Sequence, residues 1–187
     1  MDWIETDLSH GPGWTDAILF RLVFEAAKSA NDQEMFDLAE LAHALRGSAE
    51  LALESTSQGK AFVRAVSESW SLPEVEIFQQ RLNARNIEIT LPVAAAISCA
   101  AEEIEVREAL FFFVQANAAN LISAAVRLIP LGQSEGQRAL LDLETSICKA
   151  VEKAPTITVD TLGTSTPMID LSLIHISEPT SRYAISY

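Results

Sequence analysis

The sequence predicts an all-α fold, a single-domain bundle of several helices, and three observations support this prediction. Apolar residues recur every three or four positions along most of the chain, which is the helical period. Proline and capping residues stand where helices would begin, and glycine stands where they would break. The run Thr156–Val159 alternates as a β-strand does, but one short strand has no evident partner, so the segment after Ala154 is expected to be mostly irregular.

The first predicted helices lie in the N-terminal third. Thr15 is a candidate N-cap for a helix that ends at about Ser29. Asp32 is a candidate N-cap for the next helix, which carries one apolar stripe. The pattern leaves open whether that helix continues as far as Ser55, with Gly47 as its weak point.

The middle of the chain contains two clear helix starts. Gln58-Gly59 predicts a break or kink ahead of the next apolar run. Ser71-Leu-Pro-Glu74 combines a capping serine, a first-turn proline and a glutamate three positions after the serine, so a helix is expected to begin here. Leu91-Pro92 opens another helix, which is expected to reach about Glu103.

The central helix is predicted over residues 105–128, and a last long helix over Gln133–Lys153. Pro130 cannot donate a hydrogen bond inside a helix and favours an extended Ile129, so the central helix is expected to stop there. Gly132 is expected to adopt a positive φ at the corner between the two helices.

The central helix is unusually apolar, since Ala109 to Val126 contains no charged residue. Its length approaches that of a membrane span, but Gln115, Asn117 and other polar residues interrupt it, so we predict a buried helix of a bundle. Its many alanines allow neighbouring helices to approach closely. Packing inside one chain and a contact between two subunits both fit this pattern.

Composition limits the classes of partner. The formal net charge of −13 argues against binding to nucleic acid or to an anionic membrane, because both require a surplus of Lys and Arg. Cys99 and Cys148 occur in apolar surroundings without a C-x-x-C pattern, and the N-terminal residues do not form a secretory signal. A reducing cytoplasm is the simplest location.

Motifs for catalysis or metal binding are lacking. The three histidines, His10, His43 and His175, are scattered, and no zinc, phosphate-loop or nucleophile motif occurs. The acidic residues between Glu102 and Glu108 are the best candidate for a small helical enzyme, although their spacing is more typical of a solvated helix start. We therefore predict an interaction protein and no catalytic residue.

Several stretches carry a resemblance to a known family. Arg127-Leu-Ile-Pro-Leu-Gly-Gln-Ser-Glu-Gly-Gln137 resembles the signature of the urease accessory protein F (UreF) family, and Asn120–Val126 leads into it as in the family. Arg46–Glu50 together with Glu54–Lys60 is similar to the family's glutamate-serine-x-x-glutamine-glycine region, and Leu91–Val93 resembles the opening of its next helix. The resemblance covers roughly residues 3–170.

The resemblance implies a cytoplasmic, all-α, non-catalytic protein that assists nickel delivery to apo-urease. Implied partners are UreD (also called UreH), the GTPase UreG and apo-urease, and the full-length protein is expected to form a homodimer. The sequence itself shows no directly bound cofactor and no recognisable set of metal ligands. The signature positions carried over are Arg127, Gly132, Gln133, Gly136 and Gln137, with Glu54, Gln58 and Gly59 as a second group.

Both ends depart from the family pattern. Residues 1–170 are expected to form the UreF-like domain without the family's first segment. Residues 171–187 resemble a translated library-adapter sequence and are expected to be a non-native tail. A generic helical adaptor unrelated to nickel is the alternative to the accessory role.

Overall fold

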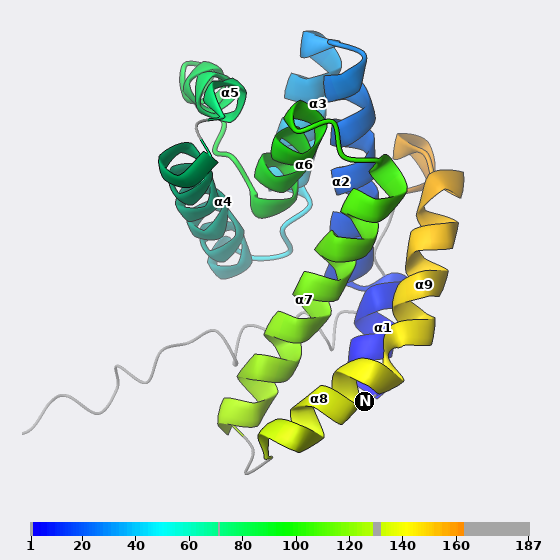
Figure 1. The fold of residues 1–187 in the computed structure, drawn as a ribbon. Coiled ribbons are helices and arrows are strands. Elements are labelled where there is room, and N and C mark those ends of the chain that lie inside the picture. The colour runs from blue at the N-terminus through cyan, green and yellow to red at the C-terminus, as the bar shows by residue number, and fades with distance from the viewer. Residues whose placement is uncertain (1, 71, 129–131, 163–187) are drawn as a thin grey trace, which may run out of the picture.

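The computed structural model describes residues 2–70, 72–128 and 132–162, and every regular element in these ranges is helical (Figure 1). This confirms the all-α prediction. The elements are α1 (Asp2–His10), α2 (Pro12–Lys28), α3 (Asp32–Ala44), α4 (Ala49–Trp70), α5 (Pro73–Asn83), α6 (Leu91–Ala101), α7 (Val106–Leu128), α8 (Gln133–Asp142), α9 (Glu144–Lys153) and the short 3-10 turns η1 (Ala154–Thr156) and η2 (Val159–Thr161).

Helices α2 and α6 form the centre of the bundle. Helix α2 packs against α1, α3, α6 and α7, while α4 and α5 lie to one side against α6 (Figure 1). Phe20 of α2 is fully buried and stacks on Phe113 of α7, with ring centroids 4.7 Å apart. The helices that carry most of the predicted site residues, α4, α7 and α8, are arranged around this core.

The N-terminal helices differ from the prediction in detail. Helix α1 was not expected, and α2 begins at Pro12 with Gly11 as its N-cap. Thr15 lies inside the first turn, where its hydroxyl donates to the Gly11 carbonyl at 3.3 Å, so its assignment as a cap was wrong. Pro12 has no N–H to satisfy at the first helical position, which favours the earlier start. The next helix is capped by Asn31, one residue before Asp32.

The two predicted weak points had opposite outcomes. The helix is interrupted around Gly47, since α3 ends at Ala44 and α4 begins at Ala49. The break predicted at Gln58-Gly59 was wrong, because α4 continues through both residues without interruption. A glycine inside a helix costs about 1 kcal/mol relative to alanine. The residue is tolerated because it lies at a close helix contact, described below.

The C-terminal half follows the predicted starts but not the predicted lengths. Pro73 and Pro92 stand in the first turns of α5 and α6, and Ser71, the proposed cap, lies outside the described residues. The single helix predicted over Gln133–Lys153 was wrong, because buried Leu143 separates α8 from α9. The turn lets α9 lie along α1 and α7 while α8 contacts the end of α7.

Helix α7 is buried on one face only. Its length and composition match those of a membrane span, yet only 33% of its most apolar window is buried in the bundle. Ala109, Phe113 and Ala118 are buried among the neighbouring helices, whereas Phe112 is 64% exposed. The prediction of a buried central helix is confirmed for the inner face and not for the outer one.

Three helices are followed by a residue in the left-handed conformation that is not glycine. Ala30, Asn86 and Glu103 have φ values of 52°, 59° and 56°. In each case the next N–H bonds five residues back, as in the Schellman motif, with Asn31 to the Ala26 carbonyl as one example at 3.0 Å. Because these caps lack glycine, the sequence pattern gave little sign of them.

Candidate functional site

The α7–α8 corner carries the signature residues of the first group. Helix α7 ends at Leu128, as predicted, and residues 129–131, including Pro130, lie outside the described residues. Gly132 is the N-cap of α8 with a φ of −74°, so the predicted positive φ was wrong. Its N–H donates to the Glu135 carboxylate at 2.7 Å, which satisfies one of the free donors at the helix start.

Gly136 allows α8 to approach α7 closely. It is the only buried residue of α8. A Cβ atom at this position would lie 3.1 Å from Cγ2 of Val126 and 3.5 Å from Cγ2 of Ile122, both on α7. The second signature glycine therefore has a structural role, because a Cβ here would require the Val126 side chain to shift by a few tenths of an ångström.

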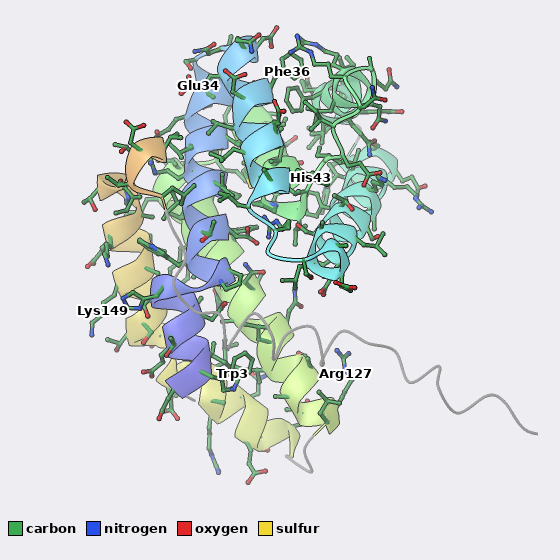
Figure 2. All side chains as sticks on the ribbon, turned by 180° about the vertical axis from the view of Figure 1, so that it is seen from behind. Trp3, Glu34, Phe36, His43, Arg127 and Lys149 are labelled. Carbon is green, nitrogen blue, oxygen red and sulfur yellow. The ribbon has the colours of Figure 1, made fainter. Side chains whose placement is uncertain are left out.

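A groove of about 240 Å³ runs between α7 and α8 at this corner. Arg127, Gln133 and Gln137 are its long polar side chains, and all three are exposed. None of them forms a hydrogen bond or an ion pair within the described part of the chain. Figure 2 shows Arg127 at the end of α7, near the edge of the molecule. The remaining lining residues are Ala119, Ile122, Ser123, Val126, Gly136 and Leu140.

The second group of signature residues lies on α4, away from the α7–α8 corner (Figure 1). The Gln58 side-chain amide donates to the Glu54 carboxylate at 3.0 Å. Partial desolvation raises the pKa of Glu54, and the hydrogen bond from Gln58 opposes this shift. Both side chains reach solvent, so this pair forms part of the surface of α4.

Gly59 faces the opposite way, into the contact between α4 and the start of α6. A Cβ atom there would lie 2.5 Å from the Ile89 carbonyl oxygen and 2.7 Å from the Thr90 carbonyl carbon. These are backbone atoms, which cannot rotate away as a side chain would. Gly59 is thus required for packing, and its conformational freedom is not needed because it lies within a regular helix.

Lys60 links α4 to the loop before α6 through an ion pair with Glu88. The hydrogen bond from Lys60 is the main reason that the pKa of Glu88 is lowered, with smaller contributions from Thr56 and from the nearby His43. Figure 2 shows His43 on α3, on the side of the molecule that carries α4. The pair is about half exposed, so its effect on stability is small.

Replacing Lys60 with methionine is expected to raise the pKa of Glu88 toward its ordinary value. In the wild-type protein, the hydrogen bond from Lys60 favours the ionised form of Glu88 and so lowers its pKa in the folded state. The pair therefore stabilises the fold at pH values above the pKa of Glu88 in the unfolded chain. This contribution is lost as the pH falls through the lower pKa of Glu88 in the folded state. An NMR titration of the Glu88 side chain measures this shift. The same titration of an Arg64→Met variant is the control, and an unchanged Glu88 pKa in the Lys60 variant would contradict the assignment.

The other candidate sites do not have an arrangement in the structure that supports catalysis or metal binding. The acidic residues between Glu102 and Glu108 are all exposed at the α6–α7 junction, as the solvated interpretation predicted. Cys99 and Cys148 are half-buried free thiols. No group of three His, Cys, Asp or Glu side chains within residues 2–70, 72–128 and 132–162 is arranged to hold a metal ion. His175 lies outside these ranges.

Comparison with known proteins agrees with the resemblance. The UreF family model matches residues 1–144. The chain belongs to the UreF family. It is 35% identical to the urease accessory protein UreF of Rhodopseudomonas palustris (strain HaA2), over 97% of this chain and 76% of that relative. Similar relatives are the UreF proteins of Bradyrhizobium diazoefficiens (36% identity, 97% and 74%) and Granulibacter bethesdensis (36%, 97% and 76%).

Two features of this UreF chain were not predicted from its sequence. Arg46, in the loop between α3 and α4, pairs with Asp16 of α2, and Lys60 pairs with Glu88. Arg46 and Lys60 both occur in the stretches that carried the resemblance, but their partners are 30 and 28 residues away. Sequence spacing within a helix cannot reveal such pairs, since it reports only neighbours three or four positions apart.

Proposed function

We propose that this UreF chain is a non-catalytic urease accessory protein that assists nickel insertion into apo-urease in the cytoplasm. Its membership of the UreF family supports the role. The observation that carries the proposal is the α7–α8 groove, because the family signature there forms a surface with three polar side chains that bond to no described residue. Such a surface is suited to binding a protein. The chain needs no cofactor of its own for this role.

The proposed partners are UreD (UreH), the GTPase UreG and apo-urease, and the chain is proposed to form a homodimer. The outer face of α7 supports a subunit contact. Ala116, Asn120 and Ser123 are exposed there, and no charged residue lies between Ala109 and Val126. In a chain of net charge −13, this small and uncharged surface allows a helix of a second subunit to approach without charge repulsion.

Co-purification with UreD tests the proposal. The chain and UreD of the same organism are expected to form a stable complex at micromolar concentration. Addition of the chain, UreD, UreG, GTP and Ni²⁺ to apo-urease is expected to produce urease activity. Omission of the chain is the control. If neither a complex nor activation is observed, the generic helical adaptor becomes the better interpretation.

A further inference from the structure

One face of α7 is left open to solvent along most of the helix. Its residues are spaced three or four positions apart, so their side chains lie in one stripe. In Figure 1, α7 runs along the front of the bundle, with α8 and α9 beside it. Ala119 is half-buried and the other members of the stripe are exposed. The stripe, called the outer face of α7 below, consists of Glu108, Phe112, Ala116, Ala119, Ser123 and Arg127.

The outer face of α7 carries a projecting ring near one end and a hollow near the other. Phe112 is 64% exposed, so most of its aromatic ring is in contact with water. Ser123, further along the same face, lines the α7–α8 groove together with the apolar residues Val126 and Leu140. An apolar cavity of about 150 Å³ can hold a benzene ring. The groove, at about 240 Å³, therefore has room for a phenylalanine side chain.

The two charges of the outer face stand at its opposite ends. Glu108 comes just before the uncharged stretch Ala109–Val126, and Arg127 comes just after it. Two copies of α7 that run in the same direction would place like charges together at both ends. Two antiparallel copies, centred between Asn117 and Ala118, place each Glu108 beside the second copy's Arg127, because the two residues are equally far from that centre. Since unlike charges attract, the face is complementary to itself only in the antiparallel arrangement.

We propose that two copies of this chain bind each other through the outer face of α7, with the two helices antiparallel and related by a two-fold axis. Phe112 and Ser123 are also equally far from the centre, so Phe112 of each copy enters the α7–α8 groove of the other. Ala116 and Ala119 lie near the middle, where their small side chains allow a close approach. This inference rests on the proposed function, because it specifies the surface and the register of the proposed homodimer.

The second copy is favoured as the occupant because each feature of the face has its complement on the same face. The ring fits the groove, the negative end matches the positive end, and the middle carries no charge that a second acidic chain would repel. A two-fold contact requires this property, because the same patch of surface must serve both subunits.

Removal of the Phe112 ring is the first test, with the mass in solution measured by sedimentation over a range of concentrations. The wild-type chain is expected to be dimeric, and Phe112→Ser is expected to raise the Kd of the dimer about tenfold or more, as loss of an aromatic anchor does. Ile77→Ser is the matched control, because Ile77 is an exposed apolar residue of α5, and less than about a twofold change is expected there. Equal effects of the two variants, or a monomeric wild-type chain, would overturn the inference.

Reversal of the charges tests the antiparallel register. Glu108→Arg and Arg127→Glu each place like charges together in both pairs of the dimer, so each is expected to raise the Kd about tenfold or more. An equimolar mixture of the two variants is expected to form a heterodimer about as tight as the wild-type dimer, because every pair again joins an arginine to a glutamate. A mixture that binds as weakly as either variant alone would overturn the antiparallel arrangement.

Two variants on α4 are the controls for the change in net charge. Glu68→Arg and Arg64→Glu alter the charge as the α7 variants do, but at exposed positions of a different helix. Each is expected to change the Kd of the dimer less than about twofold. If they weaken the dimer as much as the α7 variants do, the effect comes from the overall charge, and the inference is overturned.

The two proposals fail in different ways. If the wild-type chain is monomeric but forms a complex with UreD, the α7 contact and the homodimer fail, while the accessory role stands. If the chain dimerises as described and forms no complex with UreD, the accessory role fails, while the α7 contact stands.

Discussion

Replacing Gly59 with valine is expected to destabilise the fold by about 1–3 kcal/mol or more, which is the range for overpacking a well-packed contact. The new Cβ would stand 2.5 Å from the Ile89 carbonyl oxygen and 3.0 Å from the Leu91 nitrogen. Helix α4 would have to move away from the start of α6, and Thr90, which is fully buried at this contact, would lose its packing. Urea or thermal unfolding measures the change.

Ser57→Val is the matched control for this prediction. Ser57 is exposed on the same helix, so valine there pays only the modest helix-propensity cost of a β-branched side chain. If the two valine variants unfold at the same denaturant concentration, the close approach at Gly59 has no energetic importance. A loss confined to Gly59→Val would show that this residue stabilises the fold directly.

Gly59 also illustrates what the sequence can and cannot reveal about the fold. Its position just ahead of an apolar run predicted a break, because glycine has the lowest helix propensity after proline. The structure shows a continuous helix in which the missing side chain creates space for a neighbouring backbone. Propensity is a local property, whereas the close contact depends on residues 30 positions further along the chain. The tertiary contact therefore overrides the local preference.

The helix starts were easier to predict than the corner. Pro73 and Pro92 lie at the beginning of their helices because proline suits the first turn, and this rule acts within a few residues. Gly132 was assigned to the corner correctly but with the wrong conformation, since an N-cap with extended backbone serves there in place of a left-handed turn. Membership of the family was nevertheless predicted from the Arg127–Gln137 stretch. Its pattern of residue types is specific to the family, although it does not determine the backbone conformation of the corner.

The sequence indicated only part of the arrangement of the signature residues. The sequence placed Arg127, Gln133 and Gln137 close together along the chain, and the structure brings them to one groove between two helices. The sequence did not reveal that Glu54 and Gln58 lie on α4, on a different surface from the α7–α8 groove. Resemblance gives the positions that matter to a family, but only the packing of helices decides which of them share a surface.

Removing one partner of the Asp16–Arg46 pair is the second change expected to have a large effect. The two side chains are only 16% and 10% exposed, and they form two hydrogen bonds, of 2.5 and 3.2 Å. Arg46 also donates to the Ala42 carbonyl at 3.0 Å, near the end of α3. Asp16→Asn and Arg46→Met are each expected to cost about 2–4 kcal/mol, slightly less than a fully buried pair, because solvent screens part of the interaction.

A double-mutant cycle isolates the interaction between the two residues. The double variant is expected to be more stable than the sum of the single losses predicts, by about 1–3 kcal/mol, because each single variant leaves one charge without its partner. The exposed Arg81–Asp32 pair is the comparison, and Asp32→Asn is expected to leave the melting temperature nearly unchanged. If the losses of stability from the Asp16 and Arg46 variants are additive, the loop between α3 and α4 is held in place by packing alone. A clear coupling would instead mean that this ion pair fixes the loop between α3 and α4 to the central helix α2.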